Sequence, residues 1–191
     1  ASSMNSIAEA LGMSLTGGAI IPAPYNKRES ISFETGKRIV EMVHEDLTPS
    51  KIMTKEAFEN AIYVASAIGA SSNCPPHLTA IARHMGIDLD IDSWQKLGHD
   101  IPLLVNCQPA GEHLMEGFFK AGGIPAIMQE LMKNNKLHKN VMTVTGKTVE
   151  ENLNIKIDVD GNVIKSFKNP LVENAGFIVM KNNFFSSAVM K

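Results

Sequence analysis

The sequence contains little cysteine, no marked excess of charge and no long apolar run. Its two cysteines, Cys74 and Cys107, are far apart and show no paired spacing, which argues against a disulfide framework and for the reducing conditions of the cytoplasm. The net charge is −2 and the isoelectric point is about 6.3, values that indicate neither a nucleic-acid partner nor a membrane partner. No apolar stretch has the length of a membrane-spanning helix, and the first residues do not form a signal peptide.

What is present is ordinary globular composition, with 44% hydrophobic and 20% charged residues in 191 positions, enough for one domain with a core. Apolar residues recur at helical spacing, and the segment 54–68 is apolar on nearly all sides, which predicts a central, buried helix. In the segment 30–46, Ile39, Met42 and Val43 fall on one side, which we expect to face the core, and Glu34 can pair with Arg38 on the other side. Further helices are predicted at 1–11, 78–85, 93–97, 111–121, 124–132 and from Thr148. Thr54 is the expected N-cap of the central helix, and Thr148 with Glu151 predicts a capping box for the last one.

Short apolar segments at 19–21, 101–105 and 142–144 predict buried strands. Alternating apolar residues at 155–159 precede an Asp160-Gly161 turn, which predicts a hairpin that returns at Val163. The fold class we expect is α/β, a helix-rich layered domain with a small central sheet and a C-terminal hairpin. Apolar residues lie close to both ends of the chain, so we expect the domain to be truncated at both ends.

The densest run of small polar residues lies between two predicted helices. Gly69 can close the first helix, and Ser71, Ser72 and Asn73 then offer hydroxyl, amide and backbone N–H groups ahead of His77. Such a junction can hold an anionic or polyhydroxylated small molecule, and it can equally be a capped helix–turn–helix connection. Cys74, at the start of the second helix, is either a reactive thiolate or, as we favour, a buried inert thiol.

Two other motifs lack the residues that their chemistry needs. The segment 146–148 resembles the tail of a phosphate-binding loop, but Val141 occupies the place of the required glycine. The segment 158–162 resembles a calcium loop, but Asn169 occupies the place of the bidentate glutamate. The six histidines form no local metal-ligand pair. We therefore expect no metal ligands in this chain.

Several stretches match the pattern of a known enzyme family. The turn reads Gly-Ala-Ser-Ser-Asn at 69–73 with His77-Leu78 behind it, where the family has Gly-Gly-Ser-Thr-Asn and His-Leu. Other matching stretches are Met4-Asn5, 9–15, 36–40, 57–61 and 119–124. Together they resemble the dihydroxy-acid and sugar-acid dehydratases, which include the phosphogluconate dehydratases. The segments 98–106 and 108–111 resemble the pentonate-type enzymes more than the enzyme of branched-chain amino-acid synthesis.

The resemblance implies an enzyme that removes water from a 2,3-dihydroxy acid to give a 2-keto-3-deoxy acid. It implies an iron–sulfur cluster acting as a Lewis acid and a magnesium ion holding the carboxylate end. It also places the cluster cysteines and most magnesium ligands before Ala1, and the proton-accepting serine after Lys191. Cys74 and Cys107 do not match the ligand positions. We therefore expect neither a catalytic residue nor a bound cofactor in this chain, with Ser71, Ser72, Asn73 and His77 facing the substrate.

By the same resemblance, residues 1–153 correspond to the latter part of the family's N-terminal α/β domain. Residues 154–191 correspond to a hairpin and a crossing segment toward a further domain, and the full-length enzyme is expected to be a homo-oligomer. Two alternatives to a sugar-acid dehydratase remain open. One is a dihydroxy-acid dehydratase of branched-chain synthesis, and the other is a non-catalytic remnant or binding module.

Overall fold

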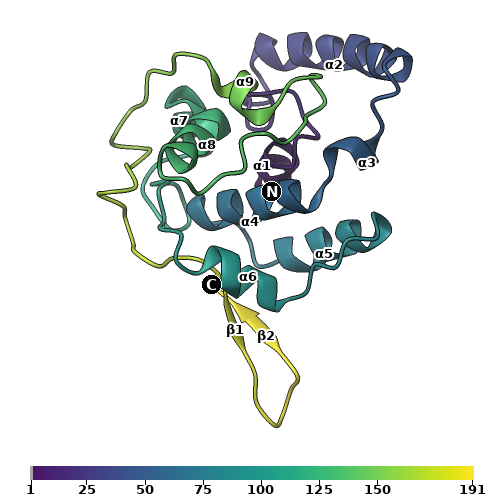
Figure 1. Ribbon diagram of the computed structural model, residues 1–191. Helices are drawn as coiled ribbons and strands as arrows, with labels where there is room; N and C mark the ends of the chain where they lie inside the picture. Colours follow the sequence, from purple (N-terminus) through teal and green to yellow (C-terminus); the bar gives the residue numbers. More distant parts are fainter. Residues whose placement is uncertain (1) are drawn as a thin grey trace.

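The computed structural model describes residues 2–191 as a helical body from which a two-stranded hairpin projects (Figure 1). The helices are α1 (Ser3–Ala10), α2 (Asn26–His44), α3 (Pro49–Ile52), α4 (Lys55–Ala67), α5 (Cys74–His84), α6 (Asp92–Gly98), α7 (Met115–Lys120), α8 (Gly123–Lys133) and α9 (Val149–Leu153). The strands are β1 (Ile178–Met180) and β2 (Ala188–Met190). Within this described part of the chain, no helix is both long and apolar enough to cross a membrane.

Helix α4 is the centre of the core, as its apolar composition predicts. It packs against α1, α5, α6 and α8, and it buries Phe58 and Ile62 completely. Thr54 is its N-cap, as predicted, because its side-chain oxygen accepts a hydrogen bond from the backbone N–H of Ala57 at 3.4 Å. The capping box predicted for the last helix is also present, since Thr148 and Glu151 bond each other's backbone N–H groups at the start of α9.

The helix-rich class is confirmed, but the small central sheet is reduced to isolated bridges. The segment 101–105 is buried as predicted, yet Leu103 and Val105 each form a single antiparallel bridge, to Val172 and Ile164. The segments 19–21 and 142–144 are buried or half-buried but form no strand. Helices take up most of the core around α4, and these short segments are buried among them without forming a continuous sheet.

The hairpin predicted at 155–163 is wrong, although its turn is present. Asp160 accepts backbone hydrogen bonds from Val163 at 3.1 Å and Ile164 at 2.9 Å, so the chain does reverse there. The returning segment pairs with 104–106 instead, because Asn106 N–H donates to the Val163 carbonyl at 2.8 Å. Burying Val163 and Ile164 against this apolar run removes more apolar surface from water than pairing with the exposed 155–159 segment would.

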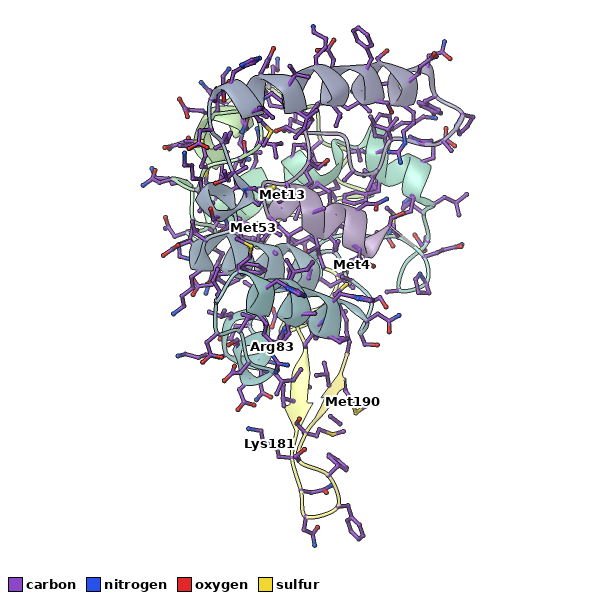
Figure 2. The ribbon with its side chains drawn as sticks, turned by 90° about the vertical axis from the view of Figure 1, so that its right-hand side faces the viewer. Met4, Met13, Met53, Arg83, Lys181 and Met190 are labelled. Carbon is purple, nitrogen blue, oxygen red and sulfur yellow. The ribbon has the colours of Figure 1, made fainter. Side chains whose placement is uncertain are left out.

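The hairpin that does form is β1–β2, with Val179 opposite Val189. Trp94 of α6 meets Phe177 at 4.9 Å between ring centroids, in an edge-to-face contact that fixes the base of the hairpin. Two residues of α6 hold the hairpin further along the chain. Gln95 accepts a hydrogen bond from Val179 N–H at 2.7 Å, and Asp92 forms an ion pair with Lys181, the residue after β1. The outer loop carries Phe184 and extends away from the helical body (Figure 2).

Helix α2 forms one edge of the body and differs from its prediction (Figure 1). Met42 is its only buried residue, whereas Ile39 and Val43 are exposed. Arg38 does not pair with Glu34; its guanidinium binds Glu45 at 2.6 Å and Glu41 at 3.0 Å. The reason is that Arg38 Nε donates to the Val144 carbonyl at 2.6 Å, which turns the side chain toward the C-terminal end of α2.

Candidate functional site

The turn between α4 and α5 has the backbone that the sequence predicts. Gly69 adopts a left-handed φ of +67°, and a Cβ there would lie 3.0 Å from a methyl group of Leu103, so glycine is required. Pro75 and Pro76 lie in the first turn of α5. Ser71 Oγ accepts a hydrogen bond from Asn73 N–H at 3.2 Å, which fixes the polar part of the turn.

The start of α1 lies beside this turn. Ser71 N–H donates to Ser3 Oγ at 3.1 Å, which joins segments 68 positions apart in the sequence. Ser6 donates through its hydroxyl and its backbone N–H to the Ser2 carbonyl, at 2.9 and 3.0 Å. The first N–H groups of a helix have no intrahelical acceptor and carry the positive end of the helix dipole. Serine hydroxyls and a positive helix end therefore meet at one place.

A cavity of about 170 Å³ opens at this meeting point. One wall comes from α1, one from the chain preceding the polar part of the turn, and one from the segment that follows the buried run 101–105. The lining residues are Ser2, Ser3, Ser6, Ile68, Gly69, Ala70, Val105, Cys107, Gln108, Pro109, Ala110, Met115 and Phe118. The mixture of three hydroxyls, one amide and an apolar floor suits a small polyhydroxylated molecule.

The four predicted site residues lie next to this cavity in sequence, but they do not line it. Ser71, Ser72 and Asn73 are grouped in the turn, and all three are exposed. His77 is exposed on α5. The structure thus brings the three turn residues together beside the cavity and leaves their side chains open to solvent.

Sequence reasoning missed the serines of α1 and Gln108 as cavity residues. The peptide bond between Gln108 and Pro109 is cis, and Gln108 N–H donates to the His113 carbonyl at 2.8 Å. The short polar run Ser2-Ser3 at the start of α1 is the available signal. It could not be connected to the turn, because the two segments meet only through tertiary packing.

Neither cysteine has the surroundings of a metal ligand or a nucleophile. Both are buried, and burial raises the pKa of Cys74 to about 11 and also raises the pKa of Cys107. The inert-thiol interpretation of Cys74 is the one that this environment supports. Among residues 2–191 no three histidine, cysteine, aspartate or glutamate side chains gather to hold a metal ion. The residues described therefore do not fit an iron–sulfur cluster or a magnesium ion.

One cation points at the inner side of the turn. Lys191 is largely exposed as a residue, but its Nζ turns inward, 3.4 Å from the Ala65 carbonyl and 4.8 Å from the ring centroid of Phe177. Burial of this ammonium lowers the pKa of Lys191 to about 8. The end of β2 thus places a positive charge behind Gly69 and Cys74.

Comparison with known proteins identifies the family. The family described as dihydroxy-acid/6-phosphogluconate dehydratase, N-terminal, matches residues 1–152. The chain belongs to this family. The matched residues include α4 and all the residues that line the cavity at the start of α1.

Curated relatives of this chain include enzymes named for two kinds of substrate. The D-xylonate dehydratase of Caulobacter vibrioides is 51% identical over the whole chain. The L-arabinonate dehydratase of Rhizobium leguminosarum bv. trifolii is 45% identical and the dihydroxy-acid dehydratase of Acetivibrio thermocellus 44% identical, each over 96% of the chain. The matched region is 32% of the length of the first two relatives and 33% of the third, so the chain spans about a third of their length.

Proposed function

We propose that this chain belongs to a hydro-lyase that converts a five-carbon sugar acid into a 2-keto-3-deoxy acid by removing water. The relatives named for D-xylonate and L-arabinonate support this substrate class. The observation that carries the proposal is the cavity at the positive end of α1, which is lined by Ser2, Ser3 and Ser6. A sugar acid has a carboxylate for the helix end and hydroxyls for the serines.

In this proposal the chain binds and orients the substrate. Ser71, Ser72 and Asn73 form the rim, with His77 behind them on α5, and these four are the substrate-contacting residues we propose. The carboxylate end of the acid lies toward Ser3, since the unpaired N–H groups of α1 attract negative charge.

The iron–sulfur cluster and the magnesium ion of the family are supplied, in this proposal, by residues outside this chain. No step of the reaction is assigned to Cys74 or Cys107, because both thiols are buried and burial raises the pKa of each. We place the enzyme in the cytoplasm, where free thiols persist.

The test is a substrate comparison with the intact protein. D-xylonate, L-arabinonate and a branched-chain 2,3-dihydroxy acid are supplied in turn, and formation of the 2-keto acid is followed. We expect kcat/KM to be at least about tenfold higher for a sugar acid than for the branched-chain acid. A preference for the branched-chain acid would support the dihydroxy-acid dehydratase alternative, which the 44% identical relative favours. Absence of turnover with all three would support the binding-module alternative.

A single substitution tests the rim. Ser72 is exposed, so Ser72→Ala leaves the fold intact and removes one hydroxyl. We expect KM to rise roughly tenfold with little change in kcat, the effect of one lost substrate hydrogen bond. The control is Ser32→Ala, which removes an exposed hydroxyl on α2 that donates to the Arg28 carbonyl. Equal KM values for the two variants would remove Ser72 from the site.

A further inference from the structure

Helix α2 carries a stripe of exposed apolar residues that the rest of the described chain does not cover. Phe33 is 68% exposed, Val40 56% and Val43 73%. With Gly36 between them, their positions 33, 36, 40 and 43 follow the three-and-four spacing of helices that pack side by side. We call these four residues the α2 seam. Such a stripe on a helix normally faces another element, because it places a continuous apolar surface in water.

Gly36 lies at a place on α2 where no other part of residues 2–191 packs closely. A Cβ added there would meet nothing within 4 Å, and a glycine inside a helix costs about 0.5–1 kcal/mol relative to alanine. Nothing in the described fold compensates for this cost. A glycine in the middle of an apolar stripe does, however, allow the backbone of a second helix to approach closely.

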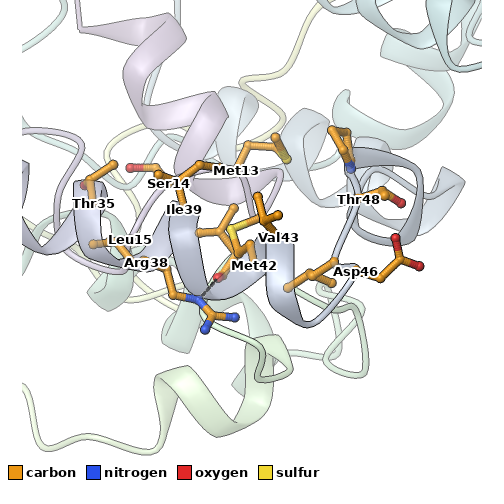
Figure 3. Close-up of a pocket in the computed structure, with 13 residues that line it drawn as sticks. Met13, Ser14, Leu15, Thr35, Arg38, Ile39, Met42, Val43, Asp46 and Thr48 are labelled. Atoms are coloured by element: carbon orange, nitrogen blue, oxygen red, sulfur yellow. Dashed lines mark hydrogen bonds between the residues drawn. The ribbon is translucent and has the colours of Figure 1, made fainter.

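The place of α2 in the molecule leaves this stripe accessible. The helix runs along one edge of the body, away from the projecting hairpin (Figures 1 and 2). Between α2 and the body lies an apolar groove of about 520 Å³, lined in part by Met13, Leu15 and Ile39 (Figure 3). Met42 is the one residue of α2 that is buried against the body, and the polar contacts are those of Arg38 with the Val144 carbonyl and of Arg28 with the Gly18 carbonyl.

The seam is complementary to itself when two copies of α2 lie antiparallel. With the two-fold axis between Gly36 and Lys37, Phe33 of one copy lies opposite Val40 of the other, and the two glycines meet near the axis. The same register places Glu29 opposite His44. Both residues are exposed, and neither forms an ion pair within residues 2–191. Antiparallel alignment also brings the positive end of each helix dipole beside the negative end of the other.

We propose that the α2 seam is a homodimer contact, in which α2 packs antiparallel against α2 of a second copy of this chain around Gly36. Phe33 and Val40 supply the apolar contact, and Glu29 and His44 set the register. The contact is independent of the serine-lined cavity, which is built from α1 and the turn after α4 rather than from α2.

Cysteine pairs in the intact protein test the register. The double variant Phe33→Cys/Val40→Cys places two thiols opposite each other across the proposed axis. In either single variant, the two copies of the thiol lie about 10 Å apart along the helices, beyond the reach of a disulfide. Under mild oxidation we expect at least about tenfold more covalent dimer from the double variant than from either single variant, and the unsubstituted protein gives the background.

The matched control is Glu34→Cys/Glu41→Cys, which has the same spacing on the side of α2 turned away from the seam. A covalent dimer from this control, or equal dimer from the single variants, would contradict the antiparallel packing. No covalent dimer from the seam pair would mean that another part of the protein covers α2. Folding is monitored by circular dichroism, and both seam side chains are more than half exposed, so the substitutions leave the core unchanged.

A charged residue introduced into the α2 seam tests the dimer contact independently of disulfide formation. For Val40→Glu we expect the dimer dissociation constant of the intact protein, measured by sedimentation, to rise at least about tenfold. Glu34→Lys is the control and is expected to leave the constant unchanged. An unchanged constant for Val40→Glu would overturn the proposal.

Discussion

Glu9 is a carboxyl group enclosed within the protein, with 5% of its surface exposed. Its two oxygens accept hydrogen bonds from the backbone N–H groups of Gly17 at 2.7 Å and Ala19 at 2.9 Å. Burial raises the pKa of Glu9 to about 7, although these hydrogen bonds oppose the rise. The residue therefore ties the loop after α1 to the helix and titrates near neutral pH.

This raised pKa has a predictable effect on stability. Between the ordinary pKa of 4.5 and the folded value of about 7, the native state binds more protons than the unfolded state. The contribution of Glu9 to the free energy of unfolding is therefore complete below pH 4.5 and is lost as the pH rises through 7, by at most about 3 kcal/mol. Comparing the unfolding free energies of the protein and Glu9→Gln between pH 4.5 and 8 measures it. Parallel pH profiles for the two proteins would contradict the prediction.

Asn60 is a polar residue in the centre of the core, fully buried on α4. Its amide donates to the His138 carbonyl at 2.9 Å and accepts from the His138 N–H at 2.7 Å. We expect Asn60→Ala to lower the free energy of unfolding by about 2–4 kcal/mol, because both backbone groups of His138 lose their partner. Chemical denaturation measures this change. Asn140→Ala, at an exposed position close by in the same loop, is the control, and an equal loss in both variants would exclude a special function for Asn60.

At the scale of elements, alanine substitutions at two glycines that have open space around them test the effect of backbone conformation without a change in packing. A Cβ would meet nothing within 4 Å at either Gly36 or Gly86. Gly36 is helical, whereas Gly86 has a φ of +69° at the end of α5. We expect Gly36→Ala to stabilise the monomeric chain by about 0.5–1 kcal/mol and Gly86→Ala to destabilise it by about 1 kcal/mol. Thermal melting of the two variants checks the opposite signs, and shifts in the same direction would contradict the argument.

The helix caps and the hairpin show which features of the elements could be predicted from neighbouring residues in the sequence. Thr54 and the pair Thr148 and Glu151 were predicted as caps because a cap depends only on residues three positions apart. The hairpin at 155–163 was predicted by the same local reasoning and was wrong. The turn depends on Asp160 and Gly161 alone. Which segment pairs with the residues after the turn depends on all the apolar segments of the chain, and in the structure that segment is 104–106 rather than 155–159.

At the scale of the whole molecule, the described residues lack a metal-binding group of side chains, and the matched relatives are about three times as long as the chain. We expect the isolated 191-residue chain neither to assemble an iron–sulfur cluster nor to dehydrate a sugar acid. The measurement is anaerobic reconstitution followed by iron and sulfide analysis and a 2-keto acid assay. Stoichiometric cluster assembly on this chain would contradict the prediction and would require a new assignment for Cys74 and Cys107.

The sequence by itself determined the helical character of the chain, the central position of α4, the left-handed turn at Gly69 and the family. Each of these depends on local spacing, on the backbone freedom of glycine or on motifs that are continuous in the chain. Only the tertiary structure decided that Ser3 meets Ser71, that Val163 pairs with 104–106 and that Ile39 and Val43 of α2 are exposed. These outcomes depend on which segments come into contact once the core around α4 has formed. The spacing of residues within one segment predicts its own secondary structure but not the distant segment that it will contact.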